Sequence, residues 1–231
     1  MLFRSLFGLG YPIYGSDIPL LVRSMIESLE MVAGKRAFVF CTQMMYSGDG
    51  AAYAGKMLRR KGFVIRQLAH FNMPNNLTDY LRFLPEPQDL TGLRIRKDRQ
   101  TRRFVEAIDR NRSLRKGMNP LSLLLGLLQR VPFQKYESAM FSHAIKIDAT
   151  CIMCGLCQRL CPVGNFQIKD GKLTEMDRCI LCYRCISHCP VQALHTNPRH
   201  TVKYQYRGPL PQFSIEDVMK PMTHEQAGHR R

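Results

Sequence analysis

The chain has 231 residues and a formal net charge of +16, from 34 basic and 18 acidic side chains. Hydrophobic residues make up 45% of it, which argues against wholesale disorder, and the length has room for two small domains. The longest apolar run, residues 123–128, is far too short to span a membrane, and no convincing secretion signal is present. We therefore predict a cytoplasmic protein without a membrane span.

The first third of the chain alternates between strand and helix patterns. The predicted elements are a strand over 5–10, a helix from about Pro19 to Gly34, a strand over 36–41, a helix capped by Asp49 and running to Gly62, and a strand over 63–68. This alternation predicts a parallel α/β sheet, in which ligands bind beyond the carboxyl ends of the strands. Cys41 lies in an apolar stretch and is predicted to be a buried, inert thiol.

Two loops that follow these strands carry aromatic residues beside glycines. The candidate ligand-contacting residues are Pro12, Tyr14 and Gly15 in the first loop and Thr42, Tyr46, Ser47, Gly48 and Asp49 around the second. Such loops can sandwich a planar ring while main-chain N–H groups bond its edge. The alternative is that the aromatic side chains are simply packed.

The middle of the chain is predicted to be helical and basic. After breaks at Pro85 and Pro87, we expect a helix from about residue 87 to 112 and a second over 119–130, ended by Pro132. Residues 93–116 hold ten Lys or Arg and three Asp or Glu. This segment is either a solvated linker or a docking surface for an acidic partner. No nucleic-acid-reading module accompanies the charge, so we expect no nucleic-acid partner.

Eight of the nine cysteines form two copies of the pattern C-x-x-C-x-x-C-x-x-x-C-P. The first copy is Cys151, Cys154, Cys157 and Cys161, and the second is Cys179, Cys182, Cys185 and Cys189. This is the run of two-cluster bacterial ferredoxins, in which the fourth cysteine of each copy ligates the other cluster. It predicts two 4Fe–4S clusters and one-electron transfer.

The crossed pattern divides the cysteines into two ligand sets. One cluster takes Cys151, Cys154, Cys157 and Cys189, and the other takes Cys179, Cys182, Cys185 and Cys161. Structural zinc prefers separated ligand pairs, and a disulfide framework needs an oxidising compartment, so both alternatives are weaker. Exposed low-potential clusters favour a reducing, anaerobic setting.

The two loops resemble flavin-contacting loops of flavodoxins, in the segments 8–17 and 42–51, and the cysteine runs resemble bacterial ferredoxins. The order of the parts is similar to EFR-type flavodoxin–ferredoxin fusion proteins. The resemblance implies a partial flavodoxin-like parallel sheet (1–86), a basic helical linker (87–144), a two-cluster ferredoxin domain (145–200) and a basic tail (201–231). The fold class is thus α/β plus α+β. It also implies FMN, although the family's first strand and Ser/Thr/Gly-rich phosphate loop do not precede the strand at 5–10.

The sequence leaves several functions open. In the first, FMN between Tyr14 and Tyr46 exchanges electron pairs, and the clusters pass single electrons to a redox protein. In the second, a ferredoxin-type carrier keeps a truncated flavodoxin-like half only as a docking module without flavin. A regulatory role for the clusters has no supporting feature. No G-x-G-x-x-G fingerprint and no catalytic base are evident, so no catalytic residue is assigned.

Overall fold

The computed structural model describes residues 6–74, 76–77, 90–196, 202, 204–208 and 213–215. The predicted breaks at Pro85 and Pro87, and most of the predicted tail over 201–231, lie outside these residues. The chain divides into two compact units, of which the first holds the sheet and residues 91–140 and the second holds the cysteine-rich part.

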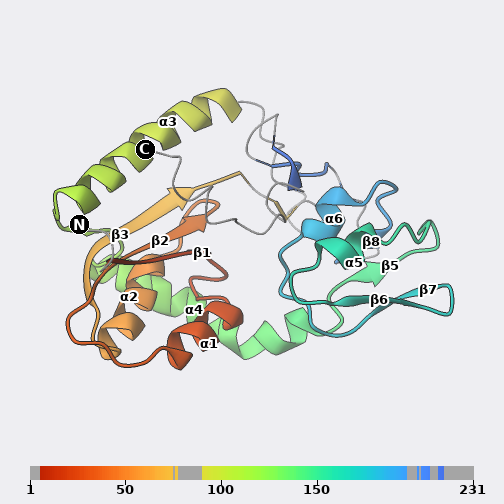
Figure 1. Cartoon of the computed structure of the whole chain (residues 1–231), viewed down its shortest axis with the longest axis horizontal. Coiled ribbons are helices and arrows are strands. Elements are labelled where there is room, and N and C mark those ends of the chain that lie inside the picture. The colour runs from red at the N-terminus through yellow and green to blue at the C-terminus, as the bar shows by residue number, and fades with distance from the viewer. Residues whose placement is uncertain are drawn as a thin grey trace. The chain divides into compact units, whose positions relative to one another are not determined.

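A parallel sheet forms the first unit. Its strands are β1 (Leu6–Pro12), β2 (Arg36–Gln43), β3 (Val64–Asn72) and β4 (Leu114–Arg115), hydrogen-bonded in that order (Figure 1). The three predicted strands are present. The two-residue β4 was not predicted, because it lies in a stretch that reads as part of a basic helical segment.

Helices cover both faces of the sheet, with α1 (Leu20–Ser28) and α2 (Gly50–Arg60) on one side and α3 (Leu90–Asp109) on the other (Figure 1). The alternation of side chains along β2 explains this arrangement, since successive residues point to opposite faces. Val39 is in the core under α1 and α2, whereas Phe38 and Phe40 contact Phe104 of α3 edge to face. Both faces of β2 are therefore at least partly covered.

The long helix α4 (Pro120–Phe141) runs through Pro132, where the sequence predicted an end. That prediction was wrong. A proline inside a helix removes one hydrogen bond and crowds the preceding turn, at about 3 kcal/mol. The helix continues because tertiary contacts fix it on both sides of the proline, through Arg130 before it and Phe133 after it. Among the described residues, no helix has the length and apolar character needed to cross a membrane.

The second unit is built from short elements. They are two antiparallel pairs, β5 (Lys146–Ile147) with β8 (Leu194–His195) and β6 (Phe166–Lys169) with β7 (Lys172–Glu175), and two helices, α5 (Leu156–Leu160) and α6 (Arg184–His188). Ile186 and Leu194 are fully enclosed in its small core. Because the elements are so short, the loops between them carry most of the functional side chains.

Candidate metal centre

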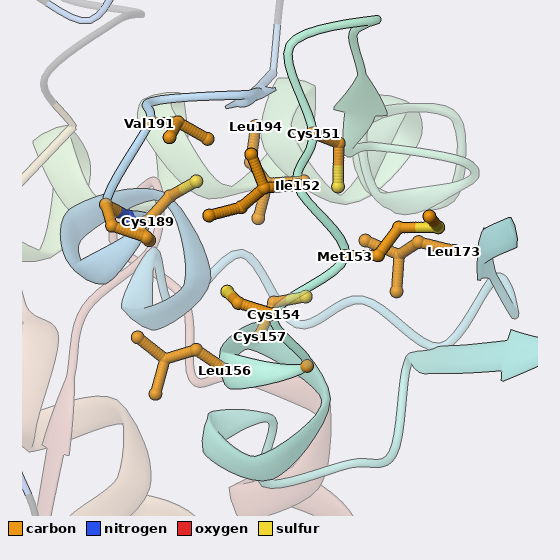
Figure 2. A pocket seen from close by; sticks show the side chains of 12 residues that line it. Cys151, Ile152, Met153, Cys154, Leu156, Cys157, Leu173, Cys189, Val191 and Leu194 are labelled. Atoms are coloured by element: carbon orange, nitrogen blue, oxygen red, sulfur yellow. The ribbon is translucent and has the colours of Figure 1, made fainter. Parts of the chain in front are cut away.

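One hollow in the second unit is lined by four cysteines, Cys151, Cys154, Cys157 and Cys189 (Figure 2). The first two lie in the loop before α5, Cys157 lies in α5, and Cys189 directly follows α6. The other side chains that the figure labels around the hollow are apolar: Ile152, Met153, Leu156, Leu173, Val191 and Leu194. The structure thus gathers three cysteines of the first run with the last cysteine of the second run.

A second hollow is lined by the remaining four cysteines, Cys161, Cys179, Cys182 and Cys185. Cys161 directly follows α5, and Cys185 lies in α6. The crossing arises because each helix carries a cysteine of one set and is followed by a cysteine of the other set. Among the described residues, no group of three or more His, Cys, Asp or Glu forms a site for a single metal ion.

The two cysteine runs have similar backbone conformations. Each cysteine of the first run has its counterpart 28 positions later in the second run. Gly155 and its counterpart Tyr183 both have left-handed φ angles, 72° and 61°. Met153 and Leu181 form a second such pair, with φ of 52° and 49°. Non-glycine residues adopt this conformation uncommonly. Its recurrence at matched positions indicates that the loop shape serves the placement of the cysteines.

Main-chain N–H groups point at the cysteine sulfurs. Asn165 N donates to Cys161 Sγ at 3.2 Å, and the matched Ala193 N donates to Cys189 Sγ at 3.3 Å. Leu181 N donates to Cys179 Sγ at 3.3 Å. Such donors stabilise negative charge on sulfur and raise the reduction potential of a bound iron–sulfur cluster.

The cysteine thiols resist ionisation on their own. Burial, with smaller contributions from the neighbouring Cys151, Cys154 and Cys189, raises the pKa of Cys157 to about 11. Burial likewise raises the pKa of Cys179 to about 11 and that of Cys185 well above its usual value. Four thiolates can share an apolar hollow only when metal charge compensates them. Sulfur donors, apolar walls and N–H groups aimed at sulfur together fit an iron–sulfur cluster.

No histidine lines either hollow among the described residues. His195 is buried, and its Nε2 lies 2.7 Å from Oδ2 of Asp148. His143 Nδ1 lies 3.5 Å from Oε2 of Glu175. These contacts assign both histidines to packing around the cysteine loops.

The eight residues predicted to contact a flavin lie at the carboxyl edge of the sheet in the first unit. They are Pro12, Tyr14, Gly15, Thr42, Tyr46, Ser47, Gly48 and Asp49. They come close together because β1 and β2 are parallel neighbours, so that both following loops leave at the same edge. The structure also places α4 against these loops, which the sequence did not predict.

Arg130 of α4 ties the two loops together. Its guanidinium pairs with the Asp49 carboxylate, and its Nε donates to the Ser16 carbonyl oxygen at 3.2 Å. Its Cζ lies 3.6 Å from the centre of the Tyr53 ring. Burial raises the pKa of the Asp49 carboxyl, and the hydrogen bond from Arg130 opposes that rise. Asp49 was predicted to cap α2, but its side chain makes no capping hydrogen bond, because it is turned to Arg130.

The α4 backbone touches the second loop directly. A Cβ atom on Gly48 would lie 2.4 Å from Cα of Gly126, and one on Gly126 would lie 1.9 Å from Oδ1 of Asp49. The Phe133 side chain packs on Gly15 of the first loop, where a Cβ atom would lie 2.5 Å from Cγ of Phe133. Only glycines allow so close an approach. Helix α4 therefore occupies the sides of Gly15, Gly48 and Asp49, three of the eight residues predicted to contact a planar ring.

A separate polar cavity of about 310 Å³ lies near the carboxyl ends of β2 and β3. Of the eight predicted residues, only Tyr46 and Gly48 line it. His70 also lines it and is 5% exposed, and its Nε2 accepts a hydrogen bond from Ala51 N at 3.2 Å. Burial, with a smaller contribution from Lys116, lowers the pKa of His70 to about 4.

The buried His70 makes the stability of the first unit depend on pH. Because the folded state keeps the imidazole neutral, protons bind the unfolded chain more readily below the ordinary histidine pKa of about 6.5. Stability is therefore full above that pKa and is lost as the pH falls toward about 4. We expect a loss of about 2 kcal/mol in the free energy of unfolding between about pH 7.5 and 5. Urea unfolding followed by circular dichroism measures it, and the profile of His70→Gln should lack this component.

Comparison with known proteins identifies the cysteine-rich part. Residues 143–190, which contain all eight cysteines, match the family described as "4Fe-4S dicluster domain". The "NADH-quinone oxidoreductase subunit I 2" of Geobacter metallireducens is 35% identical over a 66-residue alignment, which covers 22% of this chain and 50% of that protein. The chain thus spans about half the length of this curated relative. No solved structure matches the chain. This part of the chain is a ferredoxin-type 4Fe–4S domain, and iron–sulfur electron transfer is its supported function.

Proposed function

We propose that the protein carries single electrons through two 4Fe–4S clusters held by crossed sets of cysteines. One set is Cys151, Cys154, Cys157 and Cys189, and the other is Cys179, Cys182, Cys185 and Cys161. The observation that carries this proposal is the pair of hollows, each lined by one complete set. The match to a dicluster domain supports it.

The protein's own residues would control the electron transfer, while bound clusters supply the redox chemistry. The apolar walls limit the access of water, and the N–H donors of Asn165, Leu181 and Ala193 favour the reduced, more negative state. A redox protein partner would exchange the electrons. Four arginines of α3, namely Arg96, Arg99, Arg102 and Arg103, are exposed and support a partner with an acidic surface.

Iron analysis tests the number of clusters. Protein reconstituted without oxygen should contain about eight irons and eight acid-labile sulfides per chain. Spectra of the reduced protein should show cluster signals that account for all of the iron. A content of about four irons per fully loaded chain would contradict the two-cluster proposal.

For the first unit, the geometry favours a docking module without bound flavin over the FMN-binding alternative. The specific observation is the contact of α4 with both loops through Arg130, Gly126 and Phe133. We propose that residues 145–200 form the ferredoxin domain, that the sheet within 1–86 forms the module, and that the helices of 87–144 brace it. The compartment remains predicted to be cytoplasmic and anaerobic.

Titration with FMN separates the two alternatives. We expect the fluorescence of FMN at about 1 μM to stay unquenched as reconstituted protein is added to a large excess, because α4 already contacts Gly15, Gly48 and Asp49 of the two loops. Because the clusters absorb light, they lower the measured fluorescence even without binding. The titration is therefore done twice, once with cluster-loaded protein and once with a cluster-free preparation, both free of flavin beforehand. Saturable one-to-one quenching in both preparations would restore the FMN alternative.

A further inference from the structure

Helix α4 exposes its large aliphatic residues and buries small or polar ones, the reverse of an ordinary surface helix. Its buried residues are small or polar: Ser122, Gly126, Arg130 and Glu137. Six of its large aliphatic residues are exposed, with exposed fractions from 47% to 63%. They are Leu121, Leu123, Leu124, Leu127, Leu128 and Val131. An amphipathic helix of a soluble domain buries the opposite side.

The six aliphatic residues form one continuous face, which we call the leucine face. At about 100° per residue, their positions fall within an arc of about 160°, and the buried residues fall within a separate arc of about 80°. From Leu121 to Val131 the face extends about 15 Å along the helix axis. A contiguous apolar surface of this kind marks an interaction site.

The segment of the chain that carries the leucine face is basic. Residues 110–136 contain no Asp or Glu. Five of their cations are exposed: Arg110, Arg112, Arg115, Lys116 and Lys135. A second copy of the chain would bring two such basic segments together, which opposes self-association. The occupant should therefore be both apolar and anionic.

We infer that the leucine face docks on an anionic lipid surface, with α4 lying in the plane of the interface. The composition favours lipid over a protein groove, because protein hot spots are enriched in Trp, Tyr and Arg and poor in Leu and Val. An interfacial helix combines a leucine-rich side with nearby cations that attract acidic headgroups. α4 does not need to span the bilayer, since its opposite side is bound to the sheet unit through Arg130 and Gly126.

Vesicle flotation tests this inference with the full cluster-loaded chain. The vesicles contain phosphatidylcholine alone or mixed with phosphatidylglycerol. We expect binding to the mixed vesicles, weakened by salt, and little binding to phosphatidylcholine. Leu124→Gln combined with Leu128→Gln should weaken the binding about tenfold or more. The matched control, Leu20→Gln with Leu21→Gln, changes two exposed leucines of α1 and should bind like the unmodified protein.

Three outcomes would overturn the inference. They are no binding to mixed vesicles at low salt, binding that the Leu124 and Leu128 changes leave intact, and a concentration-dependent dimer that only those changes abolish. The last outcome would assign the leucine face to a second copy. Iron content and circular dichroism verify that every variant is folded and loaded. The inference does not rest on the proposed electron transfer, and its failure would leave the iron content unaffected.

Discussion

Replacing Cys154 and Cys189 together by alanine should remove one cluster and leave the other intact. In the crossed arrangement both residues belong to the same set, so the set of Cys161, Cys179, Cys182 and Cys185 stays complete. The loaded variant should hold about four irons and four sulfides per chain. Iron and sulfide analysis with spectra of the reduced protein gives the result directly.

The matched control removes the same number of cysteines in a different combination. Cys154→Ala with Cys161→Ala takes one ligand from each crossed set, so both clusters should be lost. If each run instead held its own cluster, the two double variants would exchange their results. The single variant Cys157→Ala, which should keep about half of the iron, calibrates the measurement. Cys41→Ala should keep all of it, because Cys41 is buried in the sheet of the first unit.

Replacing Arg130 by alanine should destabilise the first unit by about 3–5 kcal/mol. The change leaves the Asp49 carboxylate buried without its cation and removes the hydrogen bond to the Ser16 carbonyl. The side chains of Arg130 and Asp49 are only 7% and 8% exposed, so solvent screens the lost pair little. Because the chain has no tryptophan, urea unfolding is best followed by circular dichroism.

Arg23→Ala provides the comparison for that measurement. Arg23 pairs with Asp17 at 2.5 Å, but its side chain is 25% exposed. Asp17 also keeps hydrogen bonds from Gln134 Nε2 and Ile18 N, so its carboxylate stays satisfied. We expect a loss of about 1 kcal/mol. Equal effects of the two substitutions would mean that Arg130 does not tie α4 to the loops in solution.

Local patterns in the sequence predicted the cysteine sets and the first three strands. The spacing of Cys151, Cys154 and Cys157 is a local property, because one short loop and one helical turn carry them. Apolar runs flanked by glycines locate β1, β2 and β3 for the same reason. The assignment of Cys161 and Cys189 to the opposite sets could also be predicted from the sequence, since tandem runs of this form use their fourth cysteine in the partner set.

The contacts of α4 could not be predicted, because they depend on tertiary structure. Residues Arg130 and Asp49 are 81 positions apart, and nothing local links them. The sequence predicted a helix over 119–130, but not that close backbone contact at Gly126 would turn the side opposite its leucines toward the loops. The tertiary contacts of Arg130 and Phe133 also allow the helix to continue through Pro132. The eight predicted flavin-contacting residues are brought together, and α4, which the sequence did not place there, contacts Gly15, Gly48 and Asp49 among them.

The crossed cysteine sets have a consequence for the order in which the domain is loaded. Cys157 lies in α5, and Cys161 follows the end of that helix. A cluster bound through Cys157 would fix α5 and thereby position Cys161 for the second cluster. The second insertion would then cost less conformational entropy than the first, since part of its site is already ordered. Half-loaded protein should therefore be scarce at equilibrium, and maturation should pass from cluster-free to fully loaded chains with little intermediate.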